Sequence, residues 1–167
     1  APLATHSFVS QAIMSEYVHK NKIKVLIGGD GADELFGGYE YYKQFVDIDR
    51  FPEENPSAYS GFVTQDIVFN DWDSSELRYK LKKDWTEFAG IYSFEKNDSE
   101  RTLQTVLYSD TVVQLESVGI RAADTMSMLN SVESRGFFIT KKMIEFTLNL
   151  PATHKIDLNN KNPNMMT

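Results

Sequence analysis

The chain has 167 residues, of which 41% are hydrophobic and 13% aromatic, enough for one domain with an apolar core. Its 17 Lys and Arg against 24 Asp and Glu give a net charge of -7, which argues against a nucleic-acid partner. Cysteine is absent, which excludes disulfides and thiol catalysis. No apolar run approaches the roughly 20 residues of a membrane span, and residues 1–10 lack the basic start and the apolar stretch that are typical of a signal peptide. We therefore expect a cytoplasmic protein that does not enter a membrane.

The first third of the chain predicts a helix, a strand and a glycine-rich turn. Apolar residues recur at helical intervals from Ser7 to Tyr17. Ile23 to Ile27 is a short apolar run that stops at Gly28, and it predicts a buried strand. A helix start is expected at Asp33, because carboxylates in a first turn favour the positive end of the helix dipole. Residues 47–59 contain two prolines and predict a loop.

The rest of the chain predicts mainly helices. A helical pattern resumes over residues 39–46, and further helices are expected near 74–82, from 99 to about 119 and from 121 to about 129. The run from Met143 to Leu150 stops at Pro151. Residues 155–167 are predicted to be a poorly ordered tail. The fold class is therefore mainly α with one or two short strands, a partial piece of an α/β protein with a doubly wound parallel sheet.

The residues that suggest chemistry follow the predicted strand directly, in the segment Gly28 to Tyr39. Glycines there allow backbone N–H groups to approach phosphate, and carboxylates next to phosphate require a divalent cation between them. The glycines and acids concerned are Gly28, Gly29, Gly31, Asp30, Asp33 and Glu34. This pattern favours a nucleotide bound with a metal ion. On glycine spacing alone, a tight turn followed by helix-capping acids is an equally good interpretation.

The same segment resembles the asparagine synthase family. Gly29 to Tyr39 match the family's strand-terminal motif, Ser-Gly-(Glu/Asp)-Gly-x-Asp-Glu-(Leu/Val)-Phe-Gly-Gly-Tyr, with Gly28 in place of the usual Ser. Asp124 to Arg135 resemble a second segment, Asp-x-x-Ser-Met-x-x-Ser-Val-Glu-Ser-Arg, and Lys142 to Pro151 resemble the helix after it. Family members continue after the arginine with Val-Pro-Phe-Leu-Asp, where this chain has Gly-Phe-Phe-Ile-Thr. The resemblance implies part of an ATP-pyrophosphatase-type domain of the adenine nucleotide α-hydrolase-like fold.

The resemblance implies a carbon–nitrogen ligase of asparagine biosynthesis that uses ATP and Mg²⁺. In this family a carboxylate, usually that of aspartate, is adenylated, and ammonia then displaces AMP. By position, Asp30 would act on the adenylated intermediate and the incoming amine, and Asp33 would lie near Mg²⁺ and pyrophosphate. The same carry-over predicts contacts with ATP from the glycines and acids of the turn, namely Gly28, Gly29, Gly31, Asp33 and Glu34.

The second segment offers weaker candidates. Glu133 and Arg135 are predicted to form an ion pair that orients the catalytic site; the alternative is that they are surface charges. Asp124 faces either the site or solvent. The histidines lack metal-ligand spacing, and Ser127 has neither a nearby histidine nor a glycine elbow, so a hydrolase is not indicated.

Two motifs of the family do not occur in the chain: the Ser-Gly-Gly-x-Asp-Ser loop that binds ATP and the N-terminal cysteine of the glutaminase domain. Residues 1–167 are therefore expected to be the C-terminal part of a synthetase domain, inactive alone, with ammonia supplied by a glutaminase domain elsewhere. A homodimer remains open. Two alternatives are a family member that amidates a sugar or forms a β-lactam-type product, and a non-catalytic interaction fragment.

Overall fold

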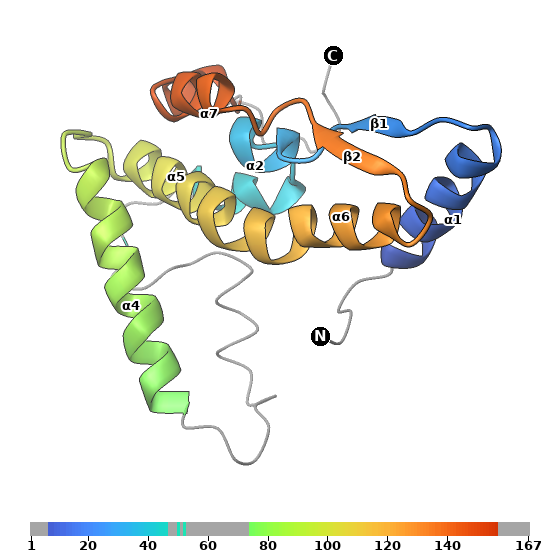
Figure 1. Ribbon diagram of the computed structural model, residues 1–167. Coiled ribbons are helices and arrows are strands. Elements are labelled where there is room, and N and C mark those ends of the chain that lie inside the picture. Colours follow the sequence, from blue (N-terminus) through green and yellow to red (C-terminus); the bar gives the residue numbers. More distant parts are fainter. Residues whose placement is uncertain (1–6, 47–49, 51, 53–73, 157–167) are drawn as a thin grey trace.

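The structure is a computed structural model that describes residues 7–46, 50, 52 and 74–156. The described chain is mainly helical, and two strands form its small sheet (Figure 1). The elements are α1 (Ser7–Lys20), β1 (Val25–Gly28), α2 (Ala32–Phe36), the 3-10 helix η1 (Glu40–Phe45), α4 (Ser74–Ile91), α5 (Asp98–Ser109), the π-helix η2 (Asp110–Ile120), α6 (Arg121–Met128), β2 (Glu133–Gly136), α7 (Lys141–Leu148) and the 3-10 helix η3 (Ala152–His154).

The strands β1 and β2 run parallel, in a register that pairs Val25 with Glu133 and Gly28 with Gly136. The prediction of a mainly helical chain with one or two short strands is therefore confirmed. The prediction that the first strand is buried is wrong for the described residues, because Ile27 is 71% exposed. Successive side chains of a strand point to opposite faces of the sheet, and the face that carries Val25 and Ile27 is exposed among the described residues, whereas Leu26 and Gly28 face α1 and α6.

Three helical segments follow one another without a break and form a long rod that crosses the molecule in Figure 1. These are α5, η2 and α6. The expected helix from residue 99 to about 119 is present, but its second half has π winding from Asp110 to Ile120. The side chain of Asn97 caps α5 by accepting a hydrogen bond from the backbone N–H of Glu100 at 3.0 Å.

Two apolar clusters hold the rod in place. On one end, α1 packs against α6 through Phe8, Ala122 and Met126. On the other, η1, α4, α5 and η3 share a larger core. Its members are Tyr42, Phe45, Trp85, Leu103, Val106, Leu107, Ala152 and Ile156. The helical pattern predicted for residues 39–46 is present as a 3-10 helix over Glu40–Phe45, and its aromatic residues Tyr42 and Phe45 are buried in the larger core.

Some predicted segments lie wholly or partly outside the described residues. Most of the proline-containing loop at 47–59 and residues 157–167 of the predicted tail are among them. The first residues of that tail are described, and Ile156 is buried in the larger core. Within the described ranges, no helix is both long and apolar enough to cross a membrane.

Candidate active site at the carboxyl end of the sheet

The turn from Gly28 to Gly31 joins the end of β1 to the start of α2. It closes through a hydrogen bond from the Ala32 backbone N–H to the Gly29 carbonyl oxygen at 3.2 Å. Gly31 has φ +90°, a left-handed conformation that glycine adopts without strain. A Cβ there would lie 2.8 Å from Cγ2 of Ile139 and 3.2 Å from Cδ2 of Leu115. The glycine therefore lets the turn settle between the segment after β2 and the helix η2.

Asp30 stands at the top of this turn, half-buried, between two cavities. The larger, of about 300 Å³, lies between the end of β2 and the rod formed by η2 and α6. Its lining residues are Asp30, Glu116, Ile120, Arg121, Ala123, Asp124, Ser134, Gly136 and Ile139. The smaller, of about 150 Å³, lies between α1, α6 and the sheet, and Gly28 and Gly29 form part of its wall. The carboxyl ends of parallel strands are where α/β proteins bind ligands.

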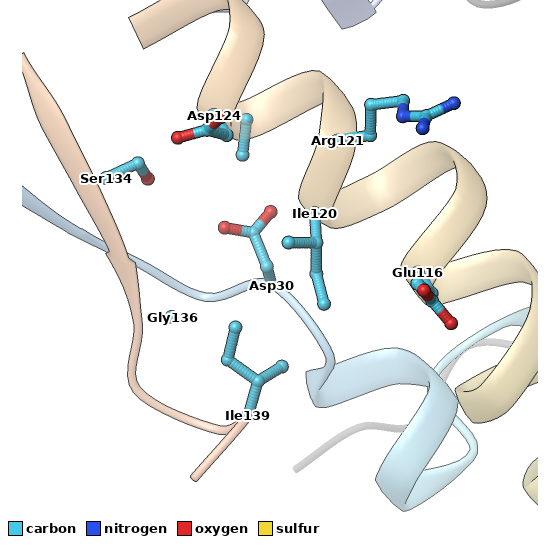
Figure 2. Close-up of a pocket in the computed structure, with 9 residues that line it drawn as sticks. Asp30, Glu116, Ile120, Arg121, Asp124, Ser134, Gly136 and Ile139 are labelled. Atoms are coloured by element: carbon cyan, nitrogen blue, oxygen red, sulfur yellow. The ribbon is translucent and has the colours of Figure 1, made fainter. Parts of the chain in front are cut away.

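Figure 2 shows the Asp30 carboxylate pointing into the larger cavity, with Asp124 and Ser134 on its opposite side. Among the described residues, no hydrogen bond or ion pair reaches this carboxylate. A Cβ at Gly28 would lie 2.6 Å from Oδ2 of Asp30, so the glycine leaves room for the carboxylate beside the strand end. An acid so placed is available to a ligand.

Glu34 and Asp33 lie away from these two cavities. Glu34 is only 4% exposed, and the Tyr39 hydroxyl donates a hydrogen bond to its Oε1 at 2.9 Å. Burial is the main cause that raises the pKa of Glu34. The Asp33 carboxylate lies against the backbone of Gly38, where a Cβ would overlap it. The structure thus brings Asp30 and the turn glycines together but does not place these two acids beside them in the cavities.

Glu133 and Arg135 form an ion pair of 2.9 Å on β2, with both side chains more than half exposed. The hydrogen bond from the guanidinium lowers the pKa of the Glu133 carboxyl. Neither residue lines the two cavities, whereas Ser134 and Gly136 do. Successive residues of a strand point to opposite faces, so the pair lies on the face turned away from α6.

Four cavity residues were not singled out from the sequence. They come from β2, from the segment after it, from η2 and from the start of α6, namely Ser134, Ile139, Glu116 and Arg121. The missing information was the strand β2. Once Glu133–Gly136 is known to pair with β1, the two-residue alternation identifies Ser134 and Gly136 as the residues that face the rod. Asp124, for which both orientations were open, lines the cavity opposite Asp30.

The donor groups in the larger cavity fit a magnesium ion that is also held by phosphate. Mg²⁺ is usually bound through one or two carboxylates, with phosphate oxygens and water completing the shell. Asp30 and Asp124 provide two carboxylates on one cavity. Glu116 lines the same cavity, but within the part of the chain that the structure describes no three His, Asp or Glu side chains are close enough together to hold a metal ion by themselves. The arrangement therefore fits an ion shared with a ligand better than one enclosed by protein groups.

Comparison with known proteins identifies the family of the chain. The asparagine synthase family, described as "Asparagine synthase", matches residues 1–163, and the chain belongs to this family. A protein of Methanocaldococcus jannaschii named "Putative asparagine synthetase (glutamine-hydrolyzing) 1" is 24% identical over 150 residues. That alignment covers 89% of this chain but only 18% of the M. jannaschii protein, so the chain spans a small part of its relative. No solved structure matches the chain significantly.

Proposed function

We propose that the chain forms one wall of a site that adenylates a carboxylate with ATP and then converts it to an amide with ammonia. Membership of the asparagine synthase family supports an ATP-dependent amidotransferase role in general terms. The observation that carries the proposal is the Asp30 carboxylate, which faces two cavities at the carboxyl end of the sheet without a partner among the described residues.

In the proposed reaction the carboxylate oxygen of the substrate attacks the α-phosphorus, pyrophosphate leaves, and the nitrogen of ammonia then displaces AMP. Mg²⁺ would neutralise charge on the phosphates. Asp30 takes the proton that the attacking nitrogen loses, a use of a carboxylate that does not require a metal. Gly29, which has no neighbouring atom within 4 Å of an added Cβ, leaves its backbone open to the nucleotide. Asp33 is the candidate for Mg²⁺ from the family motif, and Asp124, which lines the same cavity as Asp30, is a second candidate.

Aspartate is the substrate we favour, with ATP and Mg²⁺ as the nucleotide and ion, and a glutaminase domain as the source of ammonia. Glu133, Arg135, Asp33 and Glu34 keep the roles predicted from the family motif as proposals. The second candidate function is the amidation of another acceptor. It is favoured by Gly28, which stands where the family motif has Ser and borders the space that Asp30 occupies.

The test is carboxylate-dependent exchange of labelled pyrophosphate into ATP, catalysed by the complete polypeptide that contains these residues. Exchange with aspartate supports the first candidate, and exchange only with another carboxylate supports the second. Asp84→Asn, on the distant helix α4, is the matched control for Asp30→Asn. Absence of exchange with every carboxylate tried would overturn the adenylation proposal and favour a non-catalytic role. Amide formation by residues 1–167 alone would contradict the expectation that this piece is inactive by itself.

A further inference from the structure

A second acidic residue, Asp110, lies deep in the fold and has no part in the proposed chemistry. It is 1% exposed. Its Oδ2 accepts a hydrogen bond from the Tyr42 hydroxyl at 3.0 Å and another from the Tyr41 hydroxyl. The two tyrosines are consecutive residues of η1, with ring centroids 4.4 Å apart. A carboxylate held by two phenols has one fixed orientation.

The placement of Asp110 along the chain is unusual, because it is the residue at which the rod changes its winding. It caps the C-terminus of α5 and is the first residue of η2. π-Helices are rare and appear mostly as single-turn bulges inside α-helices, frequently at functional sites. The π segment here has 11 residues. The π segment begins at Asp110, and this is the residue that accepts the hydrogen bonds from Tyr41 and Tyr42.

The winding determines which side chains of the rod reach the Gly28–Gly31 turn. In a π-helix the backbone bonds join residues five apart, whereas five residues make about 1.4 turns of an α-helix. Residues five apart therefore lie on nearly the same side of a π-helix but on different sides of an α-helix. Leu115 comes five residues after Asp110, so the two side chains point toward the same side of the rod. That side faces α2 and the turn, where Leu115 meets Gly31. At the end of the π segment, Ile120 lines the cavity, and Asp124 follows one turn later.

The tyrosines connect the same network to the other side of the cavity. Tyr39 stacks on Tyr41, with ring centroids 5.5 Å apart and an interplanar angle of 13°, and donates to Glu34 of α2. The helix α2 begins immediately after Gly31. Asp110 is thus connected to the Gly28–Gly31 turn by two routes, one through η2 and one through η1. The position of Asp110 therefore affects both the turn and the helices η2 and α6 on the other side of the cavity.

Stability alone is a weak reason for an acid at this position. A buried carboxylate gives up its hydration, and apolar side chains of similar volume often stabilise a fold as well or better. Buried polar groups are better known for fixing a register than for adding stability. Charge-assisted hydrogen bonds, such as those from the two tyrosines, are strong and directional.

We propose that Asp110 is a positioning residue: through Tyr41 and Tyr42 it fixes the start of η2, and thereby the register in which Leu115, Ile120 and Asp124 face Asp30. This inference rests on the proposed function for the site that it positions. It adds a residue about which the family motif says nothing, more than one helical turn away from the cavity.

The experiment compares three changes in the complete polypeptide. Asp110→Leu removes the acceptor, the double change Tyr41→Phe with Tyr42→Phe removes both donors, and Asp110→Asn keeps an oxygen that can accept from the tyrosines. The matched control is Thr105→Val on α5, since Thr105 is also fully buried but hydrogen bonds only to the Arg101 carbonyl of its own helix. Hydrogen exchange of peptides covering 110–120, thermal unfolding and pyrophosphate exchange are measured for each.

We expect Asp110→Leu and the double tyrosine change to speed amide exchange in residues 110–120 and to lower kcat for pyrophosphate exchange roughly 100-fold, as misplacement by about 1 Å does elsewhere. Asp110→Asn should recover most of both. Thr105→Val should lower thermal stability with kcat unchanged. If Asp110→Leu leaves kcat and exchange in 110–120 as in the unmodified protein, or if Thr105→Val lowers kcat equally, the inference is overturned. If the unmodified protein shows no pyrophosphate exchange, the proposed function fails, and the amide exchange still decides whether Asp110 fixes the winding.

Discussion

Two groups of acids flank the Gly28–Gly31 turn, and their surroundings are opposite. Asp30 is half-buried, borders two cavities and receives no hydrogen bond from the described residues. Asp110 and Glu34 are almost completely buried; Asp110 accepts hydrogen bonds from two tyrosines and Glu34 accepts one from Tyr39. The comparison teaches that acid content alone does not define the site. Hydrogen bonds inside the protein hold the buried acids in place, whereas the acid that faces a cavity without a hydrogen bond is available for chemistry.

The largest expected effect is on catalysis, at Asp30, the acid that faces the cavities. Asp30→Asn should lower the rate of ammonia-dependent amide formation by roughly 100- to 10,000-fold, the usual contribution of a proton-transfer group. The thermal unfolding temperature should stay unchanged, because Asp30 makes no hydrogen bond in the described fold. The measurement is the steady-state rate at saturating substrates, with Asp84→Asn as the control. If Asp30→Asn lowered the unfolding temperature as much as a substitution of the buried Asp110 does, the distinction between Asp30 and the buried acids would be wrong.

For the buried acid Asp110, we expect an effect of pH on the free energy of unfolding. Burial raises the pKa of Asp110 to about 6 from its ordinary value of 3.8. Between these values the folded state holds a proton that the unfolded state has released, so the free energy of unfolding falls as pH rises. The fall should be about 3 kcal/mol and complete near pH 7. Urea unfolding across pH 3 to 8 measures it, and Asp110→Asn should flatten that part of the curve. A curve unchanged by the substitution would contradict the burial argument.

The turn between the two groups should respond through its backbone. Gly31→Ala places a Cβ 2.8 Å from Ile139 at φ +90°, and we expect a destabilisation of about 2 kcal/mol. Gly29→Ala is the matched control, because an added Cβ there meets no atom within 4 Å, and stability should not change. Denaturant unfolding of both variants gives the difference. Equal destabilisation by the two substitutions would show that the space between Leu115 and Ile139 can accommodate a Cβ at residue 31.

The smallest effect is expected at the exposed pair. Arg135→Gln should leave thermal unfolding unchanged, because the ion pair with Glu133 is exposed to solvent. Unfolding in low and high salt provides the measurement, and a clear loss of stability would be the contrary result. The rate of amide formation by the Arg135→Gln variant decides whether Arg135 has a role in catalysis. A slower reaction would support the catalytic role proposed from the motif, and an unchanged rate would leave the pair as surface charges.

The sequence predicted the positions of the helices because their signals are local. Apolar spacing marked α1 and α6, and glycines marked the end of β1. The strand β2 was not singled out, because four polar or small residues, Glu133–Gly136, carry no local pattern and become a strand only by pairing with β1. The π winding of η2 was equally invisible, since its residues also fit an α-helix. For the site, the motif identified Asp30, but only the packing separates it from Glu34, four residues away.

One edge of β1 has no partner strand among the described residues, and this has a consequence for handling the protein. Backbone N–H and C=O groups at an open strand edge are a template for pairing with another chain, and Val25 and Ile27 add exposed apolar side chains there. A preparation of residues 1–167 alone is therefore expected to aggregate by edge-to-edge association. Introducing a lysine at Ile27, whose side chain is 71% exposed, is the change that should keep such a preparation monomeric.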